Sequence, residues 1–331
     1  MSSIMTNASA MTALQTLSAT NKSLETTQSR ISTGYRVAEA KDNAAYWSIA
    51  TTMRSDNKAL SVVQDALGLG ASKVDTAYTA MNKIMERVDE IKVKLVAAVG
   101  ASADNKDKIQ SEISALQQQL KSFAESASFS GTNWLSVDSA VAAGNPSAGT
   151  HADAEIVSSF TRDAAGNVVL SKIKIDVQSI KLFDAAATTE ETRGIVEGLR
   201  LATDGQRDDT AVAGVAGTIA ATDGYSVSTL TVVGFNDTQI TQMITVADQT
   251  LSEIADAATK LGAAKKQIDL QKDFTTSLMD SIERGVGQLV DADMNKESTR
   301  LQALQVQQQL GIQALQIANS NAQRVLSLFQ N

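Results

Sequence analysis

The amino-acid sequence predicts a mainly α protein with a long antiparallel coiled-coil or helical-bundle rod, formed by both chain ends, and a small β-rich or α/β central insert. Apolar residues repeat at the 3-4 spacing of a heptad on both sides of residues 135–240. The central segment instead contains the chain's single Pro and period-two apolar runs. Helices from the two ends must therefore pair with each other.

The clearest heptad runs from Met53 to Ala98. Its first position is apolar in seven successive repeats, and we predict these residues as the rod core: Met53, Leu60, Leu67, Val74, Met81, Val88 and Leu95. At about 1.5 Å per residue this helix is on the order of 70 Å long, so it needs partner helices along its length. Gly68 and Gly70 predict close helix contacts.

Residues 1 to about 33 carry a weaker apolar ladder, diluted by Ser and Thr and interrupted by Asn21 and Gln28. Its members are Ala10, Leu14, Leu17, Leu24 and Ile31. Weak helix formers and polar seam positions predict a helix that forms only when packed. A short loop with Gly34 follows, and Asp42 stands where the next helix would be capped.

The remaining elements follow from the same periodicities. We predict a third helix from Ile109 to Ala127 and a hairpin turn at residues 164–167. Period-two apolar runs at Ile173, Ile175 and Val177 and around Val227 to Phe235 predict strands. Helical periodicity returns at Ile244 and continues into the last 40 residues. The terminal seam, which Gln308 and Gly311 break, contains Leu301, Leu304, Leu315, Ala318, Ala322, Val325 and Phe329.

Three parts are expected from this pattern. Residues 1–40 and 288–331 form a terminal coiled-coil inner core, residues 41–134 and 241–287 form a helical rod, and residues 135–240 form a variable, surface-exposed insert. The paired weak helices gain little from pairing alone. Stacking many copies side by side would offset their ordering entropy, so the pattern indicates self-assembly.

The sequence indicates neither an enzyme nor a cofactor or metal site. It has no Cys, and its single His151 lies in a loop-like stretch without convergent ligands. The net charge is −8 with scattered basic residues, which argues against nucleic acid as a partner. No apolar run approaches a membrane span, and the first 20 residues do not predict a cleaved secretory signal.

Both ends of the chain resemble bacterial flagellin. The stretch SRISTGYRVAEAKDNAA is similar to the N-terminal flagellin signature, and the stretch from LGAAKKQID to QRVLSLF is similar to the C-terminal one. The run NAAYWSIATTMRSDN resembles the short flagellins of soil and plant-associated bacteria. Among the matched N-terminal residues, we expect Arg30, Ile31, Gly34, Arg36 and Asp42 to contribute to subunit packing.

The resemblance implies a secreted structural subunit of the extracellular flagellar filament, used for swimming motility. It implies a homopolymer, with related flagellins as further possible members. It also implies unfolded passage through the flagellar type III export apparatus with a chaperone, and folding at the tip beneath the filament cap, next to hook-associated junction proteins. In the segment that animal innate receptors contact, Arg87, Glu90 and Glu112 match the family. Asp89 departs from it by replacing a basic residue, so we expect weak recognition.

Three other interpretations remain open from the sequence. A hook-filament junction protein shares flagellin-like ends, an enzyme could be carried by the central insert, and a coiled-coil adhesin would form stable oligomers in solution. The closeness of both terminal matches favours flagellin over the junction protein. Fibre formation would separate these alternatives.

Overall fold

The computed structural model describes residues 7–328 apart from 142–143, 148 and 164, with side chains described up to residue 320. Five α-helices carry most of the described chain: α1 (Ala8–Thr33), α2 (Ala44–Ala98), α3 (Ala103–Ser126), α4 (Asp237–Val290) and α5 (Met294–Leu328). The chain separates into two compact units, one formed by residues 1–59 and 278–331, the other by residues 60–277. The predicted mainly α fold with a small β insert is confirmed.

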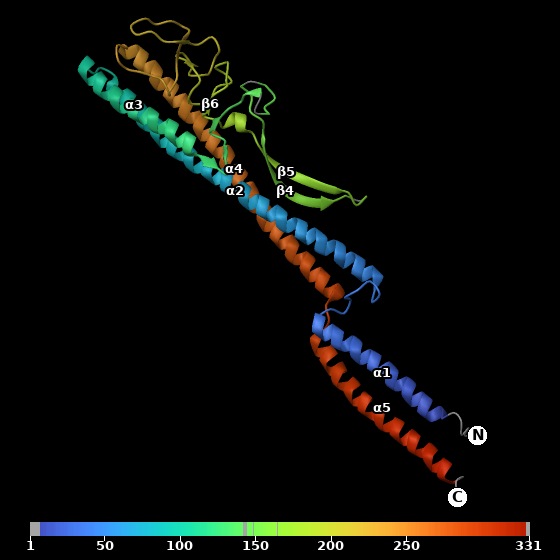
Figure 1. Cartoon of the computed structure of the whole chain (residues 1–331). Coiled ribbons are helices and arrows are strands. Elements are labelled where there is room, and N and C mark those ends of the chain that lie inside the picture. The colour runs from blue at the N-terminus through green and yellow to red at the C-terminus, as the bar shows by residue number, and fades with distance from the viewer. Residues whose placement is uncertain (1–6, 142–143, 148, 164, 329–331) are drawn as a thin grey trace. The chain divides into compact units, whose positions relative to one another are not determined.

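In the second unit, α2, α3 and α4 lie side by side (Figure 1). Three contacts set the antiparallel order of α2 and α4: Lys92 pairs with Asp248, Lys265 pairs with Asp75, and the Gln64 amide donates to the Thr276 hydroxyl at 3.1 Å. From Leu60 to Ala98, the two apolar positions of each heptad, three and four residues apart, both face inward. Every residue at these positions is buried, and Leu67, Val74 and Met81 are completely buried. The α3 helix begins six residues earlier than predicted, after the turn at Gly100.

The insert lies between α3 and α4 and contains short strands joined by long loops. Its longest pairing is the antiparallel hairpin of β4 (Ala154–Arg162) and β5 (Val168–Ile175), seen in Figure 1. The predicted turn is confirmed in its place, because the Asp163 carboxylate accepts from the backbone N–H groups of Ala165 and Asn167. Gly70 on α2 contacts this hairpin instead of a helix: a Cβ there would lie 2.6 Å from the Ile156 side chain.

The other strands of the insert are two or three residues long. They are β1 (Ser128–Phe129) with β2 (Thr132–Asn133), parallel β3 (Ser136–Val137) with β6 (Phe183–Asp184), and the sheet β7-β9-β8, made of Arg200–Leu201, Asp223–Tyr225 and Val212–Ala213. The predicted period-two continuation to Val177 is wrong, because Val177–Ser179 is a 3-10 turn whose N-cap is Asp176.

The predicted strand from Val227 to Phe235 is also wrong, because this segment consists of turns and irregular backbone. Val227, Leu230, Val232 and Phe235 are buried, whereas Val233 is exposed. Several backbone groups of the segment bond to helix side chains and not to another strand. The Gln117 amide donates to the carbonyl oxygens of Val227 and Leu230, both at 3.0 Å, and the Gln110 side chain accepts from the Val232 N–H at 2.8 Å. Buried backbone groups need partners, and here α3 supplies them.

Candidate assembly surface

The first unit contains the terminal helices α1 and α5, which run side by side (Figure 1). Of the apolar ladder predicted for α1, Ala10, Leu17, Leu24 and Ile31 lie at least partly buried in the observed seam. Leu14, together with Asn21 and Gln28, lies on the flank of the seam. The observed α1 seam consists of buried or partly buried residues that alternate at spacings of three and four. They are Ala10, Ala13, Leu17, Thr20, Leu24, Thr27 and Ile31.

The seam of α5 follows the predicted pattern more closely. Its partly buried or buried positions are Glu297, Leu301, Leu304, Gln308, Gly311, Leu315 and Ala318. Gln308 and Gly311 therefore stay within the seam, although the sequence marks them as interruptions. Phe329 lies outside the described residues, and the side chains of Ala322 and Val325 lie beyond those described.

Three contacts fix the antiparallel order of the pair. Near the junction, Arg30 Nη1 lies 3.3 Å from the Glu297 carboxylate. Further along, the Gln308 amide donates to Asn21 Oδ1 at 2.8 Å, so the two polar interruptions meet each other. Leu17 lies against Gly311, where a Cβ would come within 3.2 Å of its side chain. The small and polar seam residues therefore accommodate groups on the opposite helix.

The outer surface of this pair carries large apolar side chains. Met11 is 65% exposed and Leu14 is 60% exposed. Beyond Met294 at its first position, α5 exposes the large apolar side chains of Val306, Leu310, Ile312 and Ile317. Several exposed large apolar side chains on one helix pair are typical of a protein–protein contact. We refer to these six side chains as the terminal apolar surface.

The junction between α1 and α2 lies against the junction between α4 and α5. Gly34, with φ of +76°, ends α1 in the left-handed conformation that favours glycine, and its N–H donates to the Arg30 carbonyl. The Val290 carbonyl accepts from the N–H groups of Arg36 and Val37, and the Gly34 carbonyl accepts from Ala292 N–H at 2.8 Å. Backbone hydrogen bonds thus tie the two connections together.

Side chains strengthen the same junction. Arg36 Nη2 donates to the Leu289 carbonyl at 3.0 Å, and the Arg54 guanidinium lies 4.7 Å from the centre of the Tyr35 ring. Asp42 accepts from two backbone N–H groups of its own loop, at Ala38 and Glu39. The expected cap at Asp42 is wrong, because Asn43 caps α2 by accepting from the Tyr46 N–H.

The predicted rod-core residues divide between the two units. Met53 is partly buried against a small cluster of Val37, Ala50, Val286 and Val290. Leu60 and the other five are buried in the second unit. In the segment that the sequence matches to a receptor contact, Arg87 Nη1 lies 2.7 Å from the Glu90 carboxylate, and Lys94 pairs with Glu112. Asp89 is exposed beside them.

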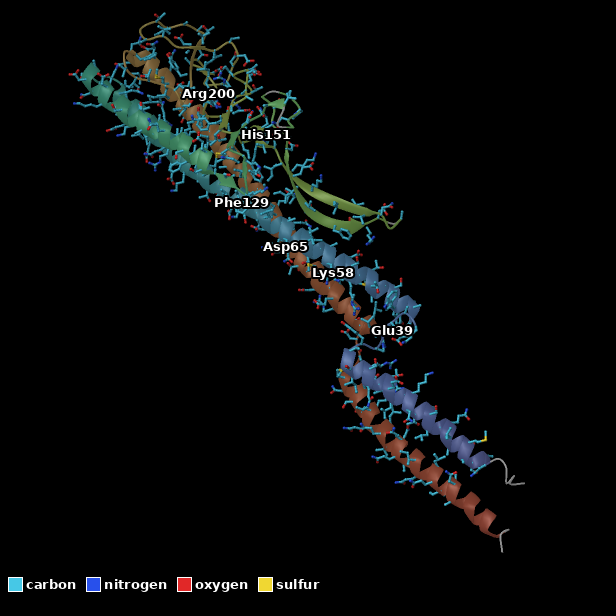
Figure 2. The ribbon with its side chains drawn as sticks, in the orientation of Figure 1. Glu39, Lys58, Asp65, Phe129, His151 and Arg200 are labelled. Atoms are coloured by element: carbon cyan, nitrogen blue, oxygen red, sulfur yellow. The ribbon has the colours of Figure 1, made fainter. Side chains whose placement is uncertain are left out.

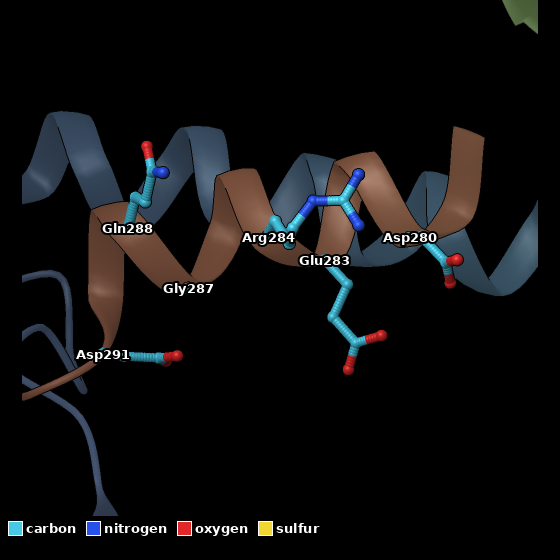
Figure 3. Close-up of a pocket in the computed structure, with 6 residues that line it drawn as sticks. All are labelled: Asp280, Glu283, Arg284, Gly287, Gln288 and Asp291. Atoms are coloured by element: carbon cyan, nitrogen blue, oxygen red, sulfur yellow. The ribbon is translucent and has the colours of Figure 1, made fainter. Parts of the chain in front are cut away.

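The described residues offer little to a ligand. An open hollow near the end of α4 is lined by Asp280, Glu283, Arg284, Gly287, Gln288 and Asp291. Figure 3 draws these residues, with the Glu283 and Asp291 side chains below the α4 ribbon in the view. His151 lies in the insert (Figure 2), where Nδ1 is 2.7 Å from the Ala152 carbonyl. Within the described ranges no group of three potential metal ligands occurs, and no helix is long and apolar enough to cross a membrane.

Sequence reasoning missed two buried charge clusters in the insert. Lys181 and Asp184 form an ion pair whose side chains are both fully buried, and Arg200 of β7 forms a bidentate pair with Glu253 of α4. A charged residue within an apolar stretch was the available signal, as in Ile180–Lys181–Leu182. It could not identify Glu253 as the partner of Arg200, because the two residues lie 53 positions apart in the sequence.

Comparison with known proteins covers both helical ends. A family model described as the bacterial flagellin N-terminal helical region matches residues 4–140, and one described as the C-terminal helical region matches residues 244–329. The chain is 50% identical to Flagellin C of Rhizobium meliloti (strain 1021) and 48% identical to Flagellin of Brucella melitensis biotype 1 (strain 16M). It is 44% identical to Flagellin A of Rhizobium meliloti. Each of these alignments covers 100% of both chains.

Proposed function

The chain belongs to the bacterial flagellin family, and from this premise we propose that its copies polymerise through the terminal apolar surface of α1 and α5. It is a structural subunit of the filament of the flagellum, the organelle used for swimming. The observation that carries the proposal is the exposure of large apolar side chains, Leu14 and Ile317 among them, on a helix pair whose own seam contains few large apolar residues.

The energetics of this pair favour contact with further copies. The α1 seam combines Ala10, Ala13, Thr20 and Thr27 with larger apolar residues, so little apolar area is buried between the two helices. Burial contributes only about 25 cal/mol per Å², whereas ordering the backbone costs roughly 1–2 kcal/mol per residue. Neighbouring copies that cover the outer surface would add the missing burial.

A division of labour along the chain goes with this proposal. Residues 1–40 and 288–331 form the inner core of the filament, residues 41–134 and 241–287 form the surrounding rod layer, and residues 135–240 face solvent. Arg30, Gly34, Arg36 and Asp42 act at the junction, where they hold the terminal pair's connections together. The division is supported by the long buried seam of α2 and by the exposed loops of the insert.

We further propose that the subunit leaves the cell unfolded through the flagellar type III export apparatus, with a chaperone, and folds beneath the filament cap. Its partners at the base are the hook-associated junction proteins, and its location is extracellular. Terminal helices with such thin seams suit this route, because they form fully only when other copies pack against them.

Electron microscopy of seeded assembly tests the proposal. Purified full-length chain and a version lacking residues 1–30 and 300–331 are each mixed with short filament fragments. We expect long filaments from the full-length chain and none from the truncated one, because truncation removes the terminal apolar surface. Circular dichroism of the truncated chain controls for folding of the remaining helices. Equal growth by both chains would refute the proposal, and growth by neither would favour a junction protein.

Recognition by animal innate receptors should be weak in this protein. Arg87 and Glu90 pair with each other, and the exposed carboxylate of Asp89 replaces the basic residue that the family resemblance leads us to expect. Asp89→Arg should lower the half-maximal dose in a receptor reporter assay about tenfold or more, since like-charge contacts weaken binding. Asp65→Arg, a change at an exposed position of the same helix, is the control. A strong response to the unaltered protein would contradict this prediction.

A further inference from the structure

A cluster of two arginines and one carboxylate fastens the insert to the rod. Glu253 projects from α4 and receives both ends of the Arg200 guanidinium, at 3.0 Å for Nη1 to Oε1 and 2.7 Å for Nη2 to Oε2. Arg207 Nη2 lies 3.4 Å from the same Glu253 Oε2. Arg200 is completely buried, in the part of the insert labelled in Figure 2. A single carboxylate thus balances two guanidinium groups.

These guanidinium groups also organise the backbone of the insert. Arg200 donates to the carbonyl oxygens of Ile195 at 3.0 Å and Gly205 at 3.1 Å. Arg207 Nη1 donates to the Arg193 carbonyl at 2.6 Å. The conformation of residues 193–207 therefore depends on two cations whose shared counter-ion belongs to the rod. Without that carboxylate, Arg200 would be a buried charge without an ionic partner, which is strongly unfavourable.

The charges around Glu253 come from the insert and from α4. Arg200 and Arg207 face it from the insert, and Lys260 acts from α4 itself. Glu191 acts on Arg207, while Glu190 lies 3.4 Å from Arg193. Burial raises the pKa of Glu253. The hydrogen bonds from Arg200 and the positive charges of the two arginines lower this pKa by more than burial raises it, so it lies below its ordinary value.

Other polar links between the insert and the rod depend less on acid. The amides of Gln110 and Gln117 on α3 bond to the backbone of residues 227–232, and amides do not titrate. An ion pair between the largely buried Lys106 side chain and the exposed Asp237 carboxylate joins α3 to the start of α4. The α2 seam from Leu60 to Ala98 is apolar throughout. Among the described links from residues 193–209 to α4, acid would therefore act at Glu253.

We infer that Glu253 is an acid-sensitive clasp: its protonation releases residues 193–209 from α4 while the helical rod stays folded. A carboxylate whose folded pKa is depressed stabilises the closed clasp above the ordinary pKa of glutamate, and this stabilisation is lost as the pH falls through the depressed value. The surface of the filament subunit would then change in acid before its rod does.

Hydrogen–deuterium exchange of the full-length monomer tests the clasp, with rates corrected for the intrinsic pH dependence of exchange. Between pH 6 and pH 3 we expect protection of residues 193–209 to fall at least tenfold, while the α2 amides from Leu67 to Leu95 keep their protection. In Glu253→Gln the same local loss is expected already at pH 7. Asp248→Asn removes an equal charge from an exposed pair on the same helix and should leave residues 193–209 protected.

Three results would overturn the inference. They are an unchanged protection of residues 193–209 at pH 3, a loss shared equally by the rod, and identical behaviour of the Glu253→Gln and Asp248→Asn chains at pH 7. The pH series on the unaltered protein decides the first two of these results even where Glu253→Gln does not fold. Arg207→Gln supplies a further check, because it leaves the bidentate pair in place and should cause a smaller loss than Glu253→Gln.

Discussion

Asp184→Ala should destabilise the insert by about 3–5 kcal/mol, the range observed when one partner of a buried ion pair is removed. The side chains of Lys181 and Asp184 are both fully buried. Lys181 Nζ donates to Asp184 and to the Gly149 carbonyl, and Asp184 also accepts from the Ser139 hydroxyl and from the Ala186 N–H. Removing the carboxylate would leave a buried ammonium with one neutral acceptor.

Urea unfolding followed by tryptophan fluorescence would measure this loss. Trp134 is buried at the base of the insert, whereas Trp47 is exposed in the other unit, so a Trp47→Phe background gives a single local reporter. Glu155→Ala is the matched control, because Glu155 pairs with Lys172 on the exposed hairpin and should change stability by less than about 1 kcal/mol. Equal effects of the two substitutions would contradict the importance of burial.

The same carboxylate gives the insert a pH dependence. Burial raises the pKa of Asp184, but hydrogen bonds from Lys181 and Ser139 lower it more, so the pKa lies below its ordinary value. The stabilisation is therefore present above the ordinary pKa of aspartate and is lost as the pH falls through the depressed value. Acid acts on the insert at this site in the same direction as at Glu253.

Leu67→Ala should destabilise the rod by about 2–5 kcal/mol, through lost burial and the cavity left behind. Leu67 is completely buried in the seam between α2 and its neighbours. The matched control is Val62→Ala, since Val62 lies on the same helix and is 67% exposed, and we expect a change within about 0.5 kcal/mol. Guanidinium unfolding followed by far-ultraviolet circular dichroism measures both.

Assembly should follow the same division. Leu67→Ala weakens the rod and should slow seeded filament growth, whereas Val212→Ala changes an exposed side chain of the insert and should leave growth intact. The rod hypothesis would be wrong if the insert substitution abolished filaments while the seam substitution did not.

The sequence by itself determined the helices, because their signal is local. A heptad repeated from Met53 to Ala98 gives a helix one apolar face, whatever the position of its partner helix. From Leu60 onward, every residue at the two apolar positions of this heptad is buried. The resemblance of both ends likewise identified the family without any knowledge of packing. The hairpin turn at residues 164–167 followed from short-range turn chemistry.

The tertiary structure decided everything that depends on distant partners. The apolar residues between Val227 and Phe235 alternate as they would in a strand, but side chains of α3 form hydrogen bonds with backbone groups of this segment. Asn21 and Gln28 lie beside the α1 seam, because the direction from which α5 packs selects which stripe of a weak ladder faces inward. The Glu253 clasp joins residues 46 or more positions apart. The free energy of such contacts depends on burial and mutual distance, and these exist only once the chain has folded.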